Sequence, residues 1–205
     1  TTGLTLLATA APTRHWQTQQ GVEWYFDRVN STRVDETRPA GTATARRGLY
    51  PNGATMHSVA VFSNHTLTFD RLTLTGGARY NAFRITTPDA MLGTTTLRPS
   101  AWVGQAGASY ALRPWLRAVA SAGSAFRAPN IDDLGTLGIV DFRYELPNPR
   151  LRPERSFNTE VGLKVRSNRV AATLLAYHNR LTDFISRVRS GRDSLQGYPV
   201  FLKQN

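Results

Sequence analysis

The sequence predicts an all-β fold, an antiparallel up-and-down sheet of the kind that crosses a membrane as a β-barrel. Strand-like runs of about ten residues are joined alternately by tight turns and by long polar segments. A meander with its short turns at one end and its long loops at the other is typical of transmembrane barrels. The tight turns lie near 11–14, 69–71, 112–114 and 167–169, and the long segments near 29–54, 87–97, 126–153 and 188–197.

Apolar and polar side chains alternate along the predicted strands. In 72–82 the even positions, such as Leu74 and Tyr80, are apolar or small, whereas odd positions such as Thr75 and Arg79 are polar. A period of two indicates a strand with two different faces. We expect about nine strands, at 3–10, 16–26, 56–67, 72–82, 102–110, 115–125, 157–165, 170–186 and 198–205.

The apolar face carries many small side chains, which a soluble core would not favour, because such a core buries bulky residues. Lipid chains, in contrast, adapt to a surface of any shape. The polar residues of the opposite face suit a water-filled lumen. The small residues are Gly76, Ala78, Gly104, Ala106, Ala108, Ala118, Ala120 and Ala122.

Aromatic residues recur eight positions apart on the apolar face. Eight residues span about 26 Å of strand, which is roughly 20 Å of height at a tilt of about 40°, close to the apolar band of about 25 Å in outer-membrane barrels. We expect two aromatic belts, with ordinary half-buried strand aromatics as the alternative. The lower belt, beside the tight turns, would hold Trp16, Tyr110 and Trp115, and the upper belt Trp24, Tyr80 and Trp102.

The composition limits the possible functions. The 205 residues include no cysteine, so disulfides, thiol chemistry and cysteine-ligated metals are excluded. The 25 basic and 14 acidic residues give a net charge of +11, and every basic residue except Lys164 and Lys203 is arginine. Such a charge suits nucleic acid, anionic lipid or an anionic ligand. The sequence has no basic helix and no zinc finger, so nucleic acid is not expected as a partner.

Neither a helical membrane span nor a catalytic site is predicted. No run of 18 apolar residues exists, but alternating barrel strands score low in any hydropathy window. His57 and His65 share a strand face about 26 Å apart, too far to share a metal, and Asp132-Asp133 reads as a cap or turn pair. We expect no enzyme activity, no cofactor and no metal site.

The most specific segment runs from 115 to 165. Its prolines cannot donate hydrogen bonds to a sheet, so they end strand pairing around a loop. This order of motifs resembles the barrel domain of TonB-dependent outer-membrane receptors. The motifs are Phe126-Arg127-Ala128-Pro129, then Asn148-Pro149-x-Leu151-x-Pro153-Glu154, then Glu160-x-Gly162-Leu163. We expect these residues to anchor strand ends, and Glu154, Arg155, Glu160 and Lys164 to form a charged ladder with Arg117 and Arg127.

The resemblance implies a protein of the bacterial outer membrane. Its barrel would have about 22 strands around a plug, and residues 1–205 would form part of that barrel. Both ends of the sequence look like cuts through a longer protein, so the plug and the TonB box would lie outside it. The partners implied are outer-membrane lipid and lipopolysaccharide, the protein's own plug, TonB, and a small ligand such as a ferric siderophore or a similar metal chelate.

Ligand choice is expected in the long loops, where arginine is frequent. Guanidinium groups bind carboxylates and phosphates with two parallel hydrogen bonds, which favours an anionic chelate. The alternative is that these arginines bind lipopolysaccharide phosphates or are simply solvated. The candidate residues are Arg33, Arg38, Arg46, Arg47, Arg143 and Tyr144.

Two other functions stay open at this point. A passive outer-membrane channel such as a porin would have the same alternating strands but no plug. A soluble β-rich adhesion or carbohydrate-binding module would need bulky packing on one face, where this chain offers alanine and glycine.

Overall fold

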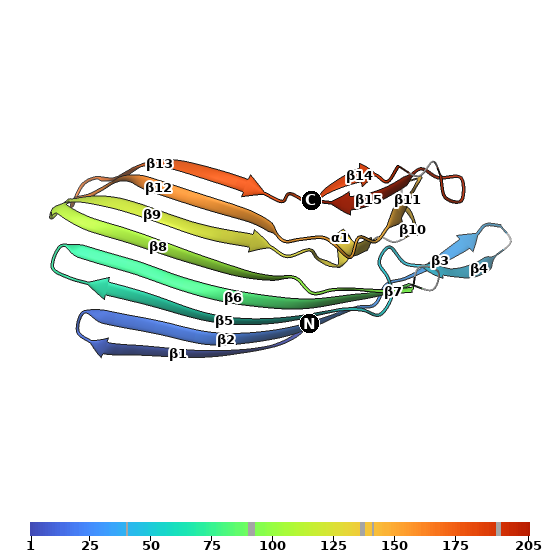
Figure 1. Cartoon of the computed structure of the whole chain (residues 1–205), viewed down its shortest axis with the longest axis horizontal. Helices are drawn as coiled ribbons and strands as arrows, with labels where there is room; N and C mark the ends of the chain where they lie inside the picture. Colours follow the sequence, from blue (N-terminus) through green and yellow to red (C-terminus); the bar gives the residue numbers. More distant parts are fainter. Residues whose placement is uncertain (40, 90–92, 136–137, 141, 192–193) are drawn as a thin grey trace.

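The computed structural model describes all residues except 40, 90–92, 136–137, 141 and 192–193. Its main feature is one antiparallel sheet in which each long strand lies beside the next one along the chain (Figure 1). The long strands are β1 (Thr2–Thr13), β2 (Trp16–Val29), β5 (Ala54–Thr68), β6 (Leu72–Asp89), β8 (Ser100–Arg113), β9 (Leu116–Arg127), β12 (Glu154–Arg166) and β13 (Ala171–Thr182).

The two ends of this sheet differ as the sequence predicts. The tight turns that join β1 to β2, β5 to β6, β8 to β9 and β12 to β13 all lie at one end (Figure 1). The long connections lie at the other end and carry short elements of their own. These are β3 (Thr32–Thr37), β4 (Thr42–Arg47), β7 (Gly93–Leu97), α1 (Ile131–Gly135), β10 (Gly138–Val140), β11 (Arg143–Leu146), β14 (Ser186–Arg189) and β15 (Val200–Gln204).

The short elements form separate pairings at the loop end. Strands β3 and β4 make a two-stranded hairpin, and β7 folds back onto β6 as the ninth strand of the main sheet. Strands β10, β11, β15 and β14 form a small second sheet in that order. In the described part of the chain, no helix has the length and apolar character to cross a membrane.

Two strand predictions were wrong near the end of the chain. The run 170–186 was expected as one strand, but β13 ends at Thr182, and Asp183 takes a left-handed conformation with φ 56° that turns the chain away. The run 198–205 was expected as the ninth strand of the meander. Instead β15 pairs in parallel with β11 and antiparallel with β14, and Val200 is fully buried there.

The strand register places the apolar side chains on a common face. Leu6 lies opposite Val22, Val22 opposite Val61, Val61 opposite Tyr80, and Tyr80 opposite Trp102. The alternation predicted separately in each strand therefore has one phase across the sheet. The edges are β1 and β13, so the sheet is open in the part of the chain that the structure describes.

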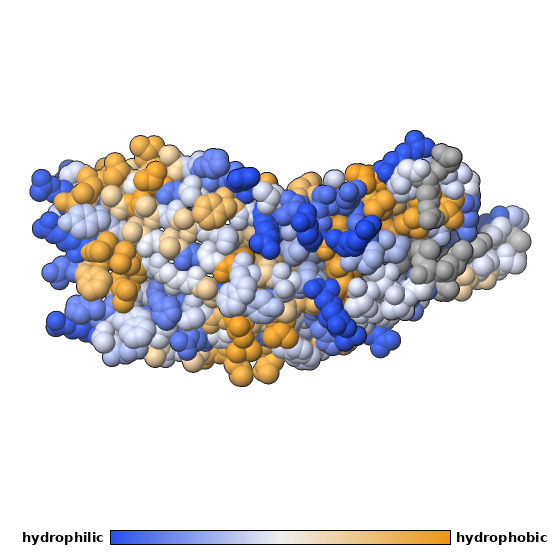
Figure 2. Space-filling view, in the orientation of Figure 1, coloured by the Kyte–Doolittle hydropathy of each residue, from blue (hydrophilic) through white to orange (hydrophobic). Residues whose placement is uncertain are grey.

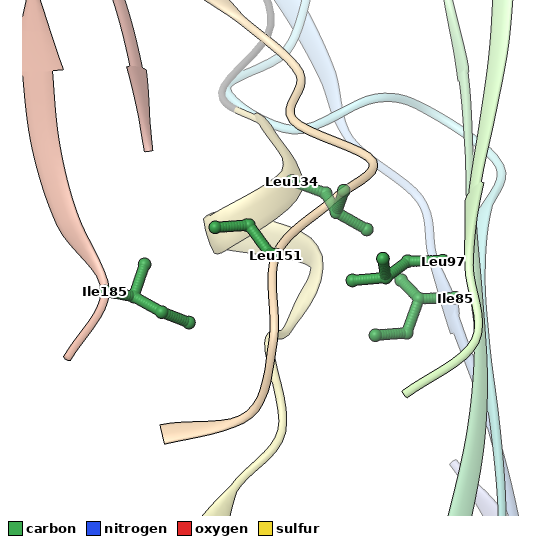
Figure 3. Packing of buried hydrophobic residues seen from close by; sticks show 5 residues of the cluster. All are labelled: Ile85, Leu97, Leu134, Leu151 and Ile185. Atoms are coloured by element: carbon green, nitrogen blue, oxygen red, sulfur yellow. The ribbon is translucent and has the colours of Figure 1, made fainter. Parts of the chain in front are cut away.

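The compact apolar core lies at the loop end and not within the main sheet. Figure 3 shows five of its side chains, which come from β6, β7, α1 and two loop segments. In the main sheet, large apolar side chains stay exposed, including Leu6 at 61% and Trp102 at 67%. Such exposure is not expected of a soluble protein, but it is expected of a lipid-facing surface. The core residues are Ile85, Leu97, Leu134, Leu151 and Ile185.

Gly162 of the third motif has a steric reason to be glycine. A Cβ atom at this position would collide with the carbonyl oxygen of Leu174 on β13, which is backbone and cannot swing away. We predict that Gly162→Ala lowers the free energy of unfolding by about 1–3 kcal/mol, the usual cost of overpacking. The measurement is urea unfolding of the intact protein in detergent micelles.

Gly76→Ala is the matched control for this substitution. Its added Cβ would meet only Gln105 O at 3.7 Å, an ordinary contact. Because glycine weakens a strand interior, this change should leave stability unchanged or raise it slightly. Equal unfolding midpoints for the two variants would contradict the steric explanation.

Candidate functional site

The residues of the Phe-Arg-Ala-Pro and Pro-Glu motifs meet at one point of the loop end. Arg127, the last residue of β9, donates from Nε and Nη2 to the two carboxylate oxygens of Glu154, at 2.7 and 2.9 Å. Its remaining Nη1 donates to Asp133 Oδ2 at 2.6 Å. A single guanidinium group therefore joins the end of β9 to the start of β12 and to α1. We call this set the junction.

Asp133 is positioned by the start of α1. Asn130 Oδ1 accepts a hydrogen bond from the Asp133 N–H at 2.9 Å, and Asp133 Oδ2 accepts one from the Asn130 N–H at 3.1 Å. This reciprocal pair has the form of a capping box, with aspartate in the place of the usual glutamate. Asp133 is 8% exposed. Its charge is therefore compensated inside the protein, chiefly by Arg127.

The junction also holds the last part of the chain. Glu154 Oε1 accepts a hydrogen bond from the Ile185 N–H at 2.9 Å, and Lys203 Nζ donates to Asp132 Oδ2 at 2.7 Å. The Arg127 guanidinium lowers the pKa of Glu154 by donating hydrogen bonds to its carboxylate. The pKa of Arg127 is raised in return, first by Glu154 and then by Asp133.

The other motif residues support the same region. Asn148 donates to Lys203 O at 2.9 Å and accepts from the Arg150 N–H at 3.0 Å, and the Leu151 side chain lies in the core. The Phe126 ring packs edge-to-face against the Phe83 ring, with the ring centroids 5.9 Å apart. Ala128 and Pro129 connect β9 to α1, and Pro149 and Pro153 lie in the segment that leads into β12.

Only part of the predicted charged ladder is present. The Arg127–Glu154 pair forms, while Glu160 accepts a hydrogen bond from Asn158 Nδ2 at 2.8 Å. Within the described residues, no ion pair involves Arg117, Arg155 or Lys164. The prediction that Asp132-Asp133 is a cap or turn pair is confirmed for Asp133, but neither the bond of Asp133 to Arg127 nor that of Lys203 to Asp132 was expected. The spacing Asn130-x-x-Asp133 is a capping signal that could have revealed the partner of Asp133 in this cap.

The loop residues proposed for ligand binding lie in two places, four on the β3–β4 hairpin, where Arg33 is the cross-strand partner of Arg46, and two on β11. Arg33 lies on the β3–β4 hairpin, where its exposed side chain pairs with Asp35 at 2.6 Å, and Arg38 follows β3. Arg143 lies on β11 and pairs with Glu145 at 3.2 Å. Arg46 and Arg47 lie on β4, and their side chains are outside the described part of the structure.

Tyr144 occupies a different environment from that expected. It is only 3% exposed, and its N–H donates to Pro199 O at 2.9 Å within the second sheet. Its neighbour Glu145 is buried and also pairs with Arg187 at 2.5 Å. The Tyr144 ring therefore packs inside the loop-end sheet. A ligand contact by Tyr144 stays a prediction that would require this packing to open.

The six predicted belt aromatics lie in two zones of the apolar face. In the upper zone, Tyr80 and Trp102 are cross-strand partners with ring centroids 5.0 Å apart, and Trp24 is one row nearer the loops. In the lower zone, Trp16 Nε1 donates to His65 Nδ1 at 3.2 Å, and Tyr110 and Trp115 flank the β8–β9 turn. Whether these zones meet a bilayer stays a prediction.

The polar face of the sheet carries its own network. Arg79 donates to Glu23 Oε2 at 2.5 Å and to Asn81 Oδ1 at 2.8 Å, and its guanidinium lies 5.5 Å from the Phe62 ring centroid. Asn81 is 4% exposed, yet its amide nitrogen has no hydrogen-bond partner among the described residues. A group of at least three metal-ligating side chains is also absent from these residues.

Removing the junction cation should loosen the loop end. Arg127→Gln removes the cation from Glu154 and leaves Asp133 with the more distant Lys203 at 3.5 Å. We predict that the free energy of opening the loop end falls by about 1–3 kcal/mol, less than for a fully buried pair because Arg127 is partly exposed. Hydrogen exchange at the Ile185 amide, which donates to Glu154, reports this loss locally. Arg155→Gln removes the adjacent unpaired arginine and is the control. Unchanged exchange in Arg127→Gln would show that the junction does not hold the end of the chain.

The junction should also weaken in acid. Because Arg127 lowers the pKa of Glu154, the pair is fully stabilising above the ordinary carboxyl value of 4.5, and it is lost as the pH falls through the lowered value. We expect Ile185 amide exchange to accelerate as the pH falls below 4.5, after correction for the intrinsic rate. Other carboxylates titrate as well, so the relevant quantity is the difference from Glu154→Gln. An identical pH profile in the two proteins would contradict this assignment.

Comparison with known proteins places this geometry in a family. A family model described as TonB dependent receptor-like, beta-barrel, matches residues 1–204. The comparison with curated proteins gave no significant sequence match.

Several solved structures have the same fold. The hemophore receptor HasR of Serratia marcescens, in complex with its hemophore HasA and heme, aligns with a TM-score of 0.69 and 20% identity over 99% of this chain and 36% of that one. The copper transporter OprC gives 0.73 and 18% over 99% and 33%. The ferric yersiniabactin uptake receptor FyuA of Yersinia pestis gives 0.57 and 17% over 89% and 28%. The chain spans about a third of the length of these structures, and it belongs to the TonB-dependent receptor-like β-barrel family.

Proposed function

We propose that this chain forms part of the wall of a bacterial outer-membrane receptor that takes up a scarce nutrient with energy delivered by TonB. The family match over residues 1–204 carries this proposal. The two-faced sheet supports it, because its exposed apolar face suits lipid and its polar face suits a lumen. The separation of tight turns from long loops agrees with short periplasmic turns and longer extracellular loops.

The open sheet supports a larger assembly. An unpaired strand edge in lipid leaves backbone groups without partners, each at a cost of several kcal/mol. Strands β1 and β13 present such edges in the described chain. We infer that further strands pair with both edges to close a barrel of about 22 strands, the size of the outer-membrane transporters with a plugged lumen.

The polar face supports a plug as the partner inside the lumen. This face carries the partly exposed ion pair of Arg79 with Glu23. A domain that fills the lumen would cover such polar groups. TonB would engage that plug domain, and lipopolysaccharide would contact the loop end of the apolar face.

The proposed ligand is an anionic metal chelate such as a ferric siderophore. The names of the related structures include heme, copper and ferric yersiniabactin, although these proteins share one fold. We therefore expect the loops, and not the fold, to determine which ligand is bound. On the β3–β4 hairpin, the side chain of Arg33 is 66% exposed, and Arg38 is exposed in the turn. These two arginines offer paired N–H donors to carboxylate or catecholate oxygens.

The proposal is tested by uptake of radiolabelled ferric chelates in cells that carry the intact protein. We expect uptake of at least one anionic chelate that stops when TonB is deleted or the proton gradient is collapsed. Uptake that continues without TonB would favour a passive channel. If no tested chelate is taken up although the folded protein is present in the outer membrane, the proposed transport function is wrong.

The hairpin arginines are tested by measuring how tightly the same radiolabelled chelates bind to these cells. Arg33→Gln with Arg38→Gln should weaken chelate binding roughly tenfold or more, since a hydrogen bond to a charged group contributes about 1.5–3 kcal/mol. The matched control is Arg98→Gln with Arg150→Gln, which removes the same charge from two other exposed loop-end positions. Equal binding by the two double variants would place the ligand elsewhere.

A further inference from the structure

Every tight turn that the structure describes carries arginine. The turn segments 13–16, 68–72, 112–116 and 166–171 contain five arginines and one acidic residue, Asp70, which gives a net charge of 5 − 1 = +4. Figure 2 shows the turn end of the molecule as a hydrophilic rim beside a more apolar band. We call the five residues the turn arginines. They are Arg14, Arg71, Arg113, Arg166 and Arg169.

No carboxylate in the described part of the chain neutralises the turn arginines. All five side chains belong to exposed residues, and none forms an ion pair with another described residue. Arg14 donates from Nε to His15 Nε2 at 2.8 Å, and the His15 ring stacks on Phe69. At the loop end, in contrast, Arg127 and Arg143 are paired with buried carboxylates.

The turn arginines lie just beyond the lower aromatic zone. Arg14 and Arg113 each precede a tryptophan by two positions, and Arg166 donates its backbone N–H to Trp115 O at 2.8 Å. Two residues of strand rise about 6–7 Å. The headgroup region on each side of a bilayer is roughly 5–8 Å thick. If the aromatic zone marks the edge of the hydrocarbon, the guanidinium groups lie at the depth of the phosphates.

We infer that the turn arginines form a binding surface for the headgroups of anionic phospholipids in the leaflet at the turn end. This inference rests on the membrane placement in the proposed function. Arginine binds phosphate through two parallel hydrogen bonds, and basic residues near an anionic leaflet are attracted to its surface. Every hairpin turn carries at least one of these arginines, and neighbouring hairpins lie about 10 Å apart. This spacing suits separate headgroups along a rim better than one compact ligand.

The test uses the intact protein reconstituted into phosphatidylcholine vesicles with trace spin-labelled phosphatidylglycerol or phosphatidylcholine. The fraction of motionally restricted label gives the selectivity for the anionic lipid. The turn variant combines Arg14→Gln, Arg71→Gln, Arg113→Gln and Arg169→Gln. The matched control removes the same charge near the loop end through Arg28→Gln, Arg98→Gln, Arg150→Gln and Arg189→Gln, all exposed residues.

We expect a severalfold preference for phosphatidylglycerol that high salt weakens, that the turn variant largely loses and that the loop-end variant keeps. An equal loss in both variants would mean that net charge alone sets the preference, and no loss in the turn variant would mean that other residues set it. Either result overturns the inference. Protease protection reports insertion separately. Failure of the wild-type protein to insert would overturn the proposed function as well, whereas insertion without selectivity would overturn only the lipid surface.

Discussion

The fold depends on the pairing of backbone hydrogen-bonding groups in a setting where side chains bury little. The main sheet has an exposed apolar face and a polar face with few buried residues, so packing alone cannot hold its eight long strands together. The ladders between neighbouring strands run almost without interruption, and they pair most amide and carbonyl groups of the strands that have a neighbour on both sides. In a lipid environment, where water cannot replace a lost hydrogen bond, such pairing becomes obligatory. The tight turns follow from it, because they bring adjacent strands into register with few unpaired residues.

Compact packing is needed only where the chain leaves this regular sheet. At the loop end, Leu134 and Leu151 pack against Ile85 of the sheet, and Arg127 ties the end of β9 to Glu154 and Asp133. The apolar cluster lies beside the ion pairs, and the ion pairs join the two ends of the long loop to α1. The sequence motifs of the family therefore mark the junction between β9, α1 and β12. Their residue types follow from the ion pairs and the packing of this junction, and not from the ligand that the loops bind.

Most of the strand plan was predictable from the sequence because a period of two needs no knowledge of distant residues. Leu74 and Tyr80 share a face for a local reason, and the register of Tyr80 with Val61 follows because the turn between β5 and β6 is short. The loop end was less predictable because its contacts join distant segments. Nothing near Val200 in the sequence shows that it will pair with Tyr144, and nothing near Asp132 shows that Lys203 will reach it. The burial of Tyr144 was missed for the same reason, since it depends on a sheet built from two separate loops.

The parallel pairing of β11 with β15 has a consequence for the order of assembly. Residues 144–146 and 200–202 are separated in the sequence by β12 and β13, and formation of that hairpin returns the chain to the loop end and brings the two segments close. Contacts between segments this far apart carry a large entropic cost of loop closure and form slowly. The small sheet and the core beneath it should therefore be the last parts of this region to become ordered. During insertion into a membrane, the long strands of such a chain would already be paired while the small sheet and the core at the loop end were still unfolded.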